Sequence, residues 1–402
     1  MGAGACHADR VSDHRERLVE ATAHLDAPLA LLDKDALERN ADDLVRRAAG
    51  LPVRVATKSV RVRSVIERTL TRSGFGGVMT YSLAESVWLA DHGVQDILLA
   101  YPAVQASAIR DLVAQEHRRA AITVMVDSVE SLEVIIAAAG AGHPPISVCL
   151  DIDCSLRPGV LGVRPVHLGV RRSPVRTPRA ARAVARAVED RPGFELSGLM
   201  FYDAQVAGLP DTSPAVRWVK RASDADLLER RHEIVAAVGE HAQLRFVNAG
   251  GTGSLEACAA DPVVTELTAG SGLFMPTLFD RYDAFEARPA AYFALDVVRR
   301  PARSVATCFA GGYIASGSAS ASRQPSPVWP EGLELTGTEG AGEVQTPVTG
   351  RAARDLRVGD RVLFRHAKAG EMCERFDELS IVGSDGHVET VPTYRGEGRN
   401  FG

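Results

Sequence analysis

The feature that most limits the fold is a regular alternation of apolar, β-rich segments with segments of helical character. Eight β-rich segments follow one another: VRVATK (53–58), GGVMTY (76–81), DILLAY (96–101), ITVMVD (122–127), ISVCLDID (146–153), LSGLMFY (196–202), LRFVNAG (244–250) and VTELTAG (264–270). Helical stretches such as SLAESVWLADHG lie between them, and this order is typical of parallel βαβ units. Eight units over roughly 200 residues predict an α/β fold of the (β/α)8 TIM type, since open sheets usually have fewer strands.

The regions on either side of the barrel differ from it. After about residue 285, short segments rich in Val, Thr and Gly are separated by Gly, Pro and Ser, which predicts a C-terminal antiparallel β-domain. Before the barrel, LALLD predicts a strand that joins this β-domain, and a helix is expected to begin near Asp33. We therefore predict an N-terminal extension (1–24), a barrel (25–285) and a β-domain (286–402).

Composition and charge restrict the partners. The chain has 402 residues, 46% of them hydrophobic, and a net charge of -5, so it can bury a large core but offers no basic surface for nucleic acid. Neither an apolar leader nor an apolar run of about 18 residues is present, and six cysteines occur without a disulfide spacing. We predict a soluble, cytoplasmic protein with reduced thiols and with neither nucleic acid nor membrane as a partner.

Two glycine-rich turns end the seventh and eighth predicted strands. They read NAGGTGSLE (248–256) and TAGSGLF (268–274). In a (β/α)8 barrel the active site lies at the carboxyl ends of the strands, and the loops after strands seven and eight frequently bind phosphate. One glycine-rich turn alone could be explained by the steric demands of a tight turn. Two such turns at adjacent strand ends predict a phosphate site, with backbone N–H groups and the hydroxyls of Thr252 and Ser254 as donors.

Lys58 ends the first predicted strand, in the stretch VRVATKSV. A lysine at a strand end often extends to solvent, but this one is expected to point into the same barrel mouth as the glycine turns. There a desolvated amine with a lowered pKa can form a Schiff base with a carbonyl compound. An aldehyde that carries a phosphate and condenses with Lys58 describes pyridoxal 5'-phosphate.

These residues resemble a known family. The chain looks like an alanine-racemase-type (fold type III) pyridoxal phosphate enzyme of the D-threonine aldolase and D-serine dehydratase branch. The resemblance runs from LALLD to ELSIV and depends on RVATKSV, FYDAQVAG, NAGGTGS, AGSGLF and RHAKAGEMCERFDEL. It implies a homodimer that acts on a small amino-acid substrate.

The resemblance implies roles for individual residues. Lys58 would hold the cofactor and take part in catalysis, and two turns would hold its phosphate: Gly251, Thr252, Gly253 and Ser254, then Gly270, Ser271 and Gly272. Tyr202, a second catalytic candidate, and Gln205 would face the cofactor or the substrate, unless they are a core tyrosine and a surface glutamine. Arg157 or Arg171 would lie beside the cofactor phenolate, although either could pair with a carboxylate at the surface.

A divalent metal on the β-domain is also implied, ligated in the family by a His-x-Cys or similar pair. The matching stretch offers His366, Glu371 and Cys373, a donor set that suits zinc and also admits manganese or magnesium. The same stretch is consistent with a polar hairpin that buries one cysteine. The chain also lacks the histidine that many relatives have shortly after the lysine, so the base would be a metal-bound hydroxide, Lys58 or Tyr202.

The implied reaction is aldol cleavage of a D-threonine-like β-hydroxy-α-amino acid to glycine and an aldehyde. The alternatives are a D-serine or D-threonine dehydratase, which releases a keto acid and ammonia, and an amino-acid racemase, which would need a second base such as Tyr313 from a partner subunit. A non-catalytic pyridoxal phosphate carrier is disfavoured because such a carrier needs no β-domain. A further alternative is an unrelated (β/α)8 enzyme in which Lys58 forms a Schiff base directly with a sugar phosphate. Fold alone does not distinguish it, but such an enzyme would lack visible absorbance.

Overall fold

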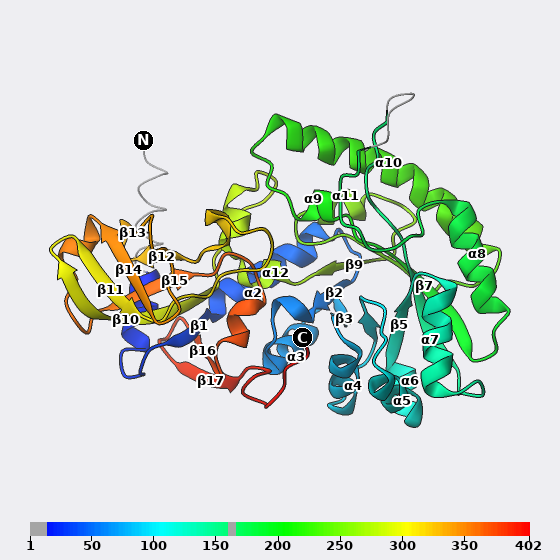
Figure 1. The fold of residues 1–402 in the computed structure, drawn as a ribbon, viewed down its shortest axis with the longest axis horizontal. Helices are drawn as coiled ribbons and strands as arrows, with labels where there is room; N and C mark the ends of the chain where they lie inside the picture. The colour runs from blue at the N-terminus through cyan, green and yellow to red at the C-terminus, as the bar shows by residue number, and fades with distance from the viewer. Residues whose placement is uncertain (1–13, 160–165) are drawn as a thin grey trace.

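The computed structural model describes residues 14–159 and 166–402. Their elements form two units: a closed barrel of eight parallel strands and a nine-stranded sheet. In Figure 1 the barrel lies at the right and the sheet at the left, with α2 and α12 between them. The predicted fold class, a (β/α)8 barrel followed by a C-terminal β-domain, is therefore confirmed.

All eight predicted barrel strands form. They are β2 (Val53–Ala56), β3 (Phe75–Thr80), β4 (Ile97–Leu99), β5 (Ile122–Val126), β6 (Ile146–Asp151), β7 (Phe194–Phe201), β8 (Phe246–Ala249) and β9 (Glu266–Ala269). Each pairs in parallel with the next, and β9 pairs with β2 to close the barrel. Closure leaves no free strand edge, so every strand has a neighbour on both sides.

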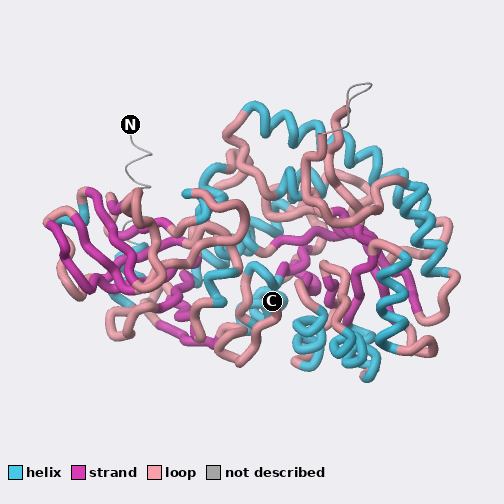
Figure 2. The backbone as a smooth tube through the Cα atoms, in the orientation of Figure 1, coloured by secondary structure: helices cyan, strands magenta, loops and turns pink. Residues whose placement is uncertain are grey.

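Helices cover the outside of the barrel (Figure 2). They are α3 (Arg63–Leu70), α4 (Leu83–Asp91), α5 (Ala106–Ala114), α6 (Glu116–Ala121), α7 (Val129–Ala139), α8 (Pro178–Glu189), α9 (Ala204–Ala207), α10 (Pro214–Gly239), α11 (Leu255–Ala259) and α12 (Ser271–Phe274). Ser82, Ser128 and Thr177 cap α4, α7 and α8, because each side chain accepts a hydrogen bond from the third residue that follows it. These local signals explain where the longer helices begin.

The barrel interior contains an apolar cluster and a buried arginine. Leu98, Met125, Cys149 and Phe246 pack together inside it. Arg54 of β2 is 1% exposed and forms ion pairs with Glu266 at 2.7 Å and Asp96 at 3.1 Å. A buried guanidinium is tolerated because these carboxylates compensate its charge.

The β-domain contains nine strands. They are β1 (Leu29–Asp33), β10 (Ala291–Ala302), β11 (Val305–Phe309), β12 (Ser326–Trp329), β13 (Leu333–Leu335), β14 (Gln345–Gly350), β15 (Arg361–Arg365), β16 (Glu378–Val382) and β17 (Val388–Pro392). As predicted, β1 joins this sheet, where it pairs antiparallel with β10 and parallel with β16. The sheet is otherwise antiparallel.

The helix α2 (Lys34–Arg47) leads from the sheet to the barrel. Asp33 caps it by accepting a hydrogen bond from the Ala36 N–H at 2.7 Å, as the sequence predicts. The Asn40 amide donates to the carbonyl oxygens of Leu273, at 3.0 Å, and Arg288, at 2.9 Å. These bonds tie α2 to the segment that follows the last barrel strand.

The described part of the predicted extension packs on the β-domain. Residues 14–21 are helical, and Leu18 lies in an apolar cluster with Leu31 and Tyr292. Arg361 donates to the Thr22 carbonyl oxygen at 2.6 Å. Residues 1–13, including Cys6, lie outside the described residues. Among the helices that the structure describes, none is both long enough and apolar enough to cross a membrane.

Candidate active site

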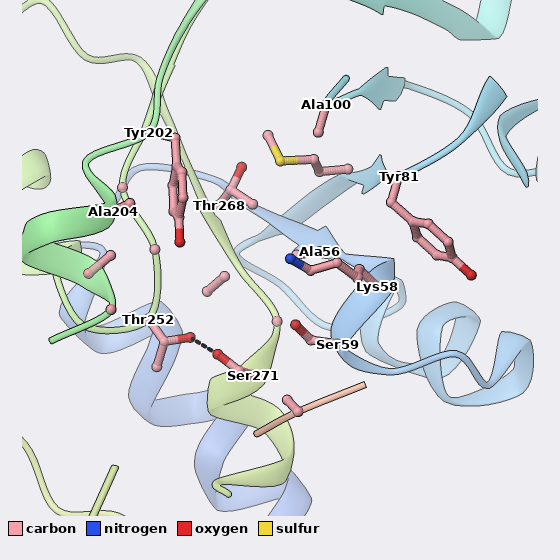
Figure 3. A pocket seen from close by; sticks show the side chains of 18 of the residues that line it. Ala56, Lys58, Ser59, Tyr81, Ala100, Tyr202, Ala204, Thr252, Thr268 and Ser271 are labelled. Carbon is pink, nitrogen blue, oxygen red and sulfur yellow. Dashed lines mark hydrogen bonds between the residues drawn. The ribbon is translucent and has the colours of Figure 1, made fainter. Parts of the chain in front are cut away.

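A cavity of about 340 Å³ opens at the carboxyl ends of the barrel strands. Its barrel side is formed by residues that follow four different strands: Lys58, Tyr81, Tyr202 and Thr252. Figure 3 shows the Lys58 amine pointing toward the middle of the cavity, with the Tyr202 ring opposite and Thr252 and Ser271 along one edge. The position and size are those of a small-molecule site on a (β/α)8 barrel.

Lys58 lies in a single 3-10 turn, η1 (Thr57–Ser59), that directly follows β2. The Thr57 hydroxyl donates to the Met79 carbonyl oxygen at 3.1 Å, which ties this turn to the neighbouring strand. Gly370 of the β-domain lies so close that a Cβ atom there would collide with the Lys58 carbonyl oxygen. The Lys58 side chain itself is exposed to the cavity, so the amine is accessible rather than desolvated as the sequence suggested.

The two glycine turns form one end of the cavity. Gly251, Thr252, Gly270 and Ser271 all line it, and the hydroxyls of Thr252 and Ser271 lie 3.2 Å apart (Figure 3). A Cβ atom at Gly270 would collide with the Ala56 carbonyl oxygen, and one at Gly251 would lie 2.8 Å from the Ala207 Cβ. The two backbones can therefore approach only as glycine, which leaves a narrow polar recess between the turns.

Three residues predicted for the phosphate site support these turns from behind. Gly253 packs against Ala207 and Tyr282, where a side chain would collide. The Ser254 hydroxyl is buried and donates to Asp203 at 3.0 Å while it accepts from the Gly251 N–H at 3.1 Å. Gly272 donates its N–H to the Thr252 hydroxyl at 3.0 Å. None of the three lines the cavity, so these residues support the turns whose other residues line it.

Tyr202 lines the cavity, but Gln205 does not. Burial raises the pKa of the Tyr202 phenol to about 12, so the group carries its proton at neutral pH. The Gln205 amide donates at 2.7 Å to the Cys154 carbonyl oxygen and is buried. Gln205 therefore lies outside the cavity lining, because the turn after β6 binds this amide.

The arginine at the cavity is neither of the two predicted ones. Arg157 pairs with Asp153, and Arg171 is exposed; neither lines the cavity. Arg172 does, with its guanidinium carbon 5.0 Å from the Tyr202 ring centroid and 5.2 Å from that of Tyr101. The sequence contains RRSP at this point, so the error is one position in a loop, where no strand periodicity assigns side chains to a face.

The β-domain forms the other wall of the cavity. Arg323, in η3 (Ala321–Arg323), and Lys368, in the loop after β15, both line it. Burial lowers the pKa of the Lys368 amine, and the charges of Lys58 and Arg323 lower it further. Neither residue was predicted. The only sequence signal was that Lys368 lies within RHAKAGEMCERF, the stretch that was interpreted as a metal site.

Contacts between the two units hold this wall in place. The Tyr394 hydroxyl donates to Glu85 at 3.0 Å, and the Tyr81 N–H donates to the same carboxyl group at 2.8 Å. Arg61, close to Lys58 in the chain, pairs with Glu374 at 2.6 Å. Burial raises the pKa of the Glu85 carboxyl group to about 7. The barrel and the β-domain therefore meet beside Lys58 through buried polar contacts.

The predicted metal ligands do not converge. His366 and Glu371 line a separate small cavity, and Cys373, which is 1% exposed, does not. Glu371 accepts a hydrogen bond from the Ser316 N–H at 2.8 Å, and burial raises the pKa of the Cys373 thiol to about 12. Within residues 14–159 and 166–402, no three His, Cys, Asp or Glu side chains are grouped to hold a metal ion. The donor set therefore does not fit zinc or manganese, since such a site needs converging, deprotonated ligands.

The barrel side of the cavity does fit pyridoxal phosphate. It combines an accessible primary amine, a flat apolar space beside the Tyr202 ring, and a recess of glycine backbone and hydroxyl groups at the far end. A phosphate group of that cofactor would occupy the recess while its aldehyde reaches Lys58. The fit rests on the close approach of the Gly270 backbone to the strand that carries Lys58, since a Cβ at Gly270 would collide with the Ala56 carbonyl oxygen.

Comparison with known families identifies the barrel. The model of the family described as "Alanine racemase, N-terminal domain" matches residues 32–277, more than half of the chain. The chain belongs to this alanine racemase N-terminal domain family. The match begins in β1 and ends after α12, so it covers the whole barrel with both glycine turns and Lys58.

Relatives with assigned activities are distant from this chain in sequence. A 3-hydroxy-D-aspartate aldolase of Paracoccus denitrificans (strain Pd 1222) is 25% identical over 268 residues, which are 66% of this chain and 65% of the relative. A D-threonine aldolase of Arthrobacter sp is 26% identical over 263 residues, 63% of this chain and 62% of the relative. The matched region thus spans less than two thirds of the length of these relatives.

Solved structures of other proteins share both units of the fold. D-threonine aldolase from Filomicrobium marinum superposes with a TM-score of 0.77 at 21% identity, over 92% of this chain and 96% of the other. D-threo-3-hydroxyaspartate dehydratase from Delftia sp. HT23 gives a TM-score of 0.73 at 21% identity, over 92% and 97%. The likeness extends beyond the barrel to the β-domain.

Proposed function

We propose that the protein is a pyridoxal phosphate-dependent lyase that cleaves a D-β-hydroxy-α-amino acid to glycine and an aldehyde. The observation that carries the proposal is the convergence of Lys58 and the two glycine turns on one cavity. Membership of the alanine racemase N-terminal domain family supports the cofactor. The relatives named as aldolases support the reaction and the D configuration of the substrate.

Each part of the barrel wall has a distinct task in this proposal. Lys58 would hold the cofactor through its amine, the turns around Thr252 and Ser271 would hold the phosphate, and Tyr202 would pack beside the ring. When bound, the cofactor supplies an electron sink that stabilises negative charge at the substrate Cα. Arg172, which faces Tyr202, would supply positive charge at the side of the ring.

Aldol cleavage requires a base for the proton of the substrate β-hydroxyl group. Removal of this proton forms the carbonyl group of the leaving aldehyde as the Cα–Cβ bond breaks, and a proton must then reach Cα to complete glycine. Tyr202 is a poor base because its raised pKa keeps the phenol protonated. Once exchanged for the substrate amine, the Lys58 amine can accept the first proton and return one to Cα. We assign it both roles.

The β-hydroxyl group is not assigned to a metal ion in this scheme. The residues expected as ligands, His366, Glu371 and Cys373, do not converge. Every step above is assigned to side chains that line the cavity. The homodimer and the cytoplasmic location remain predictions, and light scattering of the purified protein would check the first.

The test is product analysis with the purified protein reconstituted with pyridoxal phosphate. We expect acetaldehyde and glycine in equal amounts from D-threonine and no reaction with L-threonine. Pyruvate from D-serine would favour the dehydratase alternative, in which the Cα proton leaves and hydroxide is expelled. Failure to bind the cofactor, or silence with D-threonine, D-serine and 3-hydroxy-D-aspartate, the compound named for one relative, would refute the proposal.

Racemisation is the less favoured alternative. It requires a second base opposite Lys58, and Tyr313 was the predicted candidate. Within its own chain Tyr313 packs edge-on against Phe293 and Phe376, with ring centroids 4.9 and 5.3 Å away, and lines the cavity of His366. Exchange of the α-hydrogen of alanine in deuterated water with inversion would favour racemisation through a tyrosine of a partner subunit.

A further inference from the structure

The cavity lining is charged with one sign only. Four cations line it: Lys58, Arg172, Arg323 and Lys368. Among the described residues that line the cavity, none is Asp, Glu or His. In the described part of the chain, none of these four cations has a carboxylate oxygen within 4.0 Å. A pocket of this kind favours ligands that bring several negative charges.

The barrel cations already have tasks under the proposed function. Lys58 holds the cofactor, and Arg172 lies beside Tyr202. The phosphate recess is built from backbone and hydroxyl groups and uses neither of them. Arg323 and Lys368 therefore remain for the substrate, and every α-amino acid brings one carboxylate to pair with one of them. The second cation has no partner in a substrate with a neutral side chain.

The backbone around Lys368 is fixed at the edge of the cavity. Two residues later, Gly370 has φ +99° and packs so tightly against the Lys58 carbonyl oxygen that no Cβ would fit, so the loop after β15 lies directly on the Lys58 turn. Leu278 donates its N–H to the Ala367 carbonyl oxygen at 3.1 Å, and Thr277 donates to that of His366 at 3.1 Å. These interactions fix the backbone on both sides of Lys368.

The choice of lysine at this position is also informative. The chain contains only four lysines, Lys34, Lys58, Lys220 and Lys368, although it is rich in arginine. Two of the four line the same cavity. Lysine presents a compact point charge on a flexible stem, whereas arginine presents a planar fork, so a lysine suits a narrow space beside a second cation.

We propose that Arg323 and Lys368 form a cation pair that binds the two carboxylates of a dicarboxylic substrate, so that the enzyme selects β-hydroxy-α-amino acids with an acidic side chain. This inference rests on the proposed function and narrows its substrate class. It also makes binding of the acidic side chain independent of a divalent metal, because the positive charge comes from the chain itself.

Binding of non-reactive amino acids to the reconstituted holoenzyme tests the pair. D-aspartate and D-2-aminobutyrate lack the β-hydroxyl group and differ in the acidic group, and their dissociation constants are read from the change in visible absorbance. We expect D-aspartate to bind at least about tenfold more tightly, since charge-assisted contacts are the strong ones. Lys368→Met should remove most of this preference, and Lys368→Arg should retain part of it. The surface variant Lys34→Met is the matched control.

Arg323→Met is the second variant, and it should weaken both ligands because each has an α-carboxylate. The titrations are repeated after treatment with a chelator, with metal content measured by mass spectrometry. The cation pair would be overturned if the parent did not prefer D-aspartate over D-2-aminobutyrate. It would also be overturned if this preference persisted in Lys368→Met, or if it disappeared when the metal was removed. A holoenzyme that cleaves D-threonine yet shows no acidic preference would overturn this inference alone, whereas a protein that binds no pyridoxal phosphate would overturn the proposed function.

Discussion

The two walls of the cavity are built in different ways. The barrel wall consists of strand ends, where Lys58 follows β2 and two glycine turns follow β8 and β9. The β-domain wall consists of loops, from which Arg323 and Lys368 reach the same space. The barrel wall offers backbone N–H groups, hydroxyls and one amine, while the β-domain wall offers two charges without carboxylate partners among the described residues.

This difference teaches how one fold can keep a cofactor and change its substrate. A closed barrel holds its strand ends in a fixed relation, which suits a cofactor that must always lie in the same place. Loops of a second unit can change their side chains without disturbing that arrangement. We therefore expect changes in the barrel wall to affect the cofactor and changes in the β-domain wall to affect the choice of substrate.

The largest effect is expected for Lys58→Ala. Under the proposed function this amine anchors the cofactor and accepts the β-hydroxyl proton, so turnover should fall more than about a thousandfold without it. The visible absorbance of bound cofactor should shift or disappear after gel filtration. Lys34→Ala, at the exposed start of α2, is the control and should behave as the parent. If Lys58→Ala kept the visible spectrum of the parent, Lys58 would not be the residue that binds the cofactor covalently.

Gly270→Ala should weaken cofactor retention by roughly one to two orders of magnitude. The added Cβ would collide with the Ala56 carbonyl oxygen, and overpacking of this kind costs about 1–3 kcal/mol of stability. Equilibrium dialysis measures retention and thermal unfolding measures stability. Gly239→Ala, where the new Cβ meets nothing within 4 Å, is the matched control. Equal retention in the two variants would contradict the phosphate recess.

Arg172→Met should lower kcat/KM by about tenfold, the factor expected when one charged contact to a ligand is lost. Arg171→Met, at the adjacent exposed position, should have no effect. Comparison of the two variants shows which arginine faces the cavity, because they remove the same guanidinium group at adjacent positions. If Arg171→Met proved the more harmful, the loop after β6 would have to place its side chains differently from the structure.

The smallest effect concerns the contact between the two walls. The pKa of Glu85 is raised to about 7 from an ordinary value of 4.5, so between these values the folded protein keeps a proton that the unfolded chain releases. The free energy of unfolding should therefore fall as pH rises through this window and stay level above it. Between pH 5 and pH 7 the free energy of unfolding of Glu85→Gln should fall less than that of the parent, by on the order of 1 kcal/mol. Chemical denaturation at the two pH values measures this difference.

The exposed Glu130→Gln is the control for that measurement and should leave the slope of stability against pH unchanged. Asp151, whose pKa burial also raises to about 7, contributes to the same window in the parent and in both variants. An identical slope in Glu85→Gln and the parent would show that Glu85 is ionised in the folded protein.

Prediction from the sequence succeeded where the signal is local. The eight strands, the cap at Asp33, the amine at Lys58 and the glycine turn at Gly270 follow from side-chain patterns over a few residues. It failed at Arg172, where neighbouring arginines in a loop are indistinguishable. It failed also for Gln205, because the amide is bound by a carbonyl group from another strand end.

The sequence by itself therefore determined the barrel and its wall of the cavity, since strand periodicity and glycine turns are encoded along the chain. The tertiary structure alone decided the opposite wall. Gly370 lies on the carbonyl group of Lys58 although the two are far apart in the chain, and this packing brings Lys368 to the cavity while it leaves His366 and Cys373 apart. No local pattern specifies such an arrangement, because it depends on how two independently patterned units pack together.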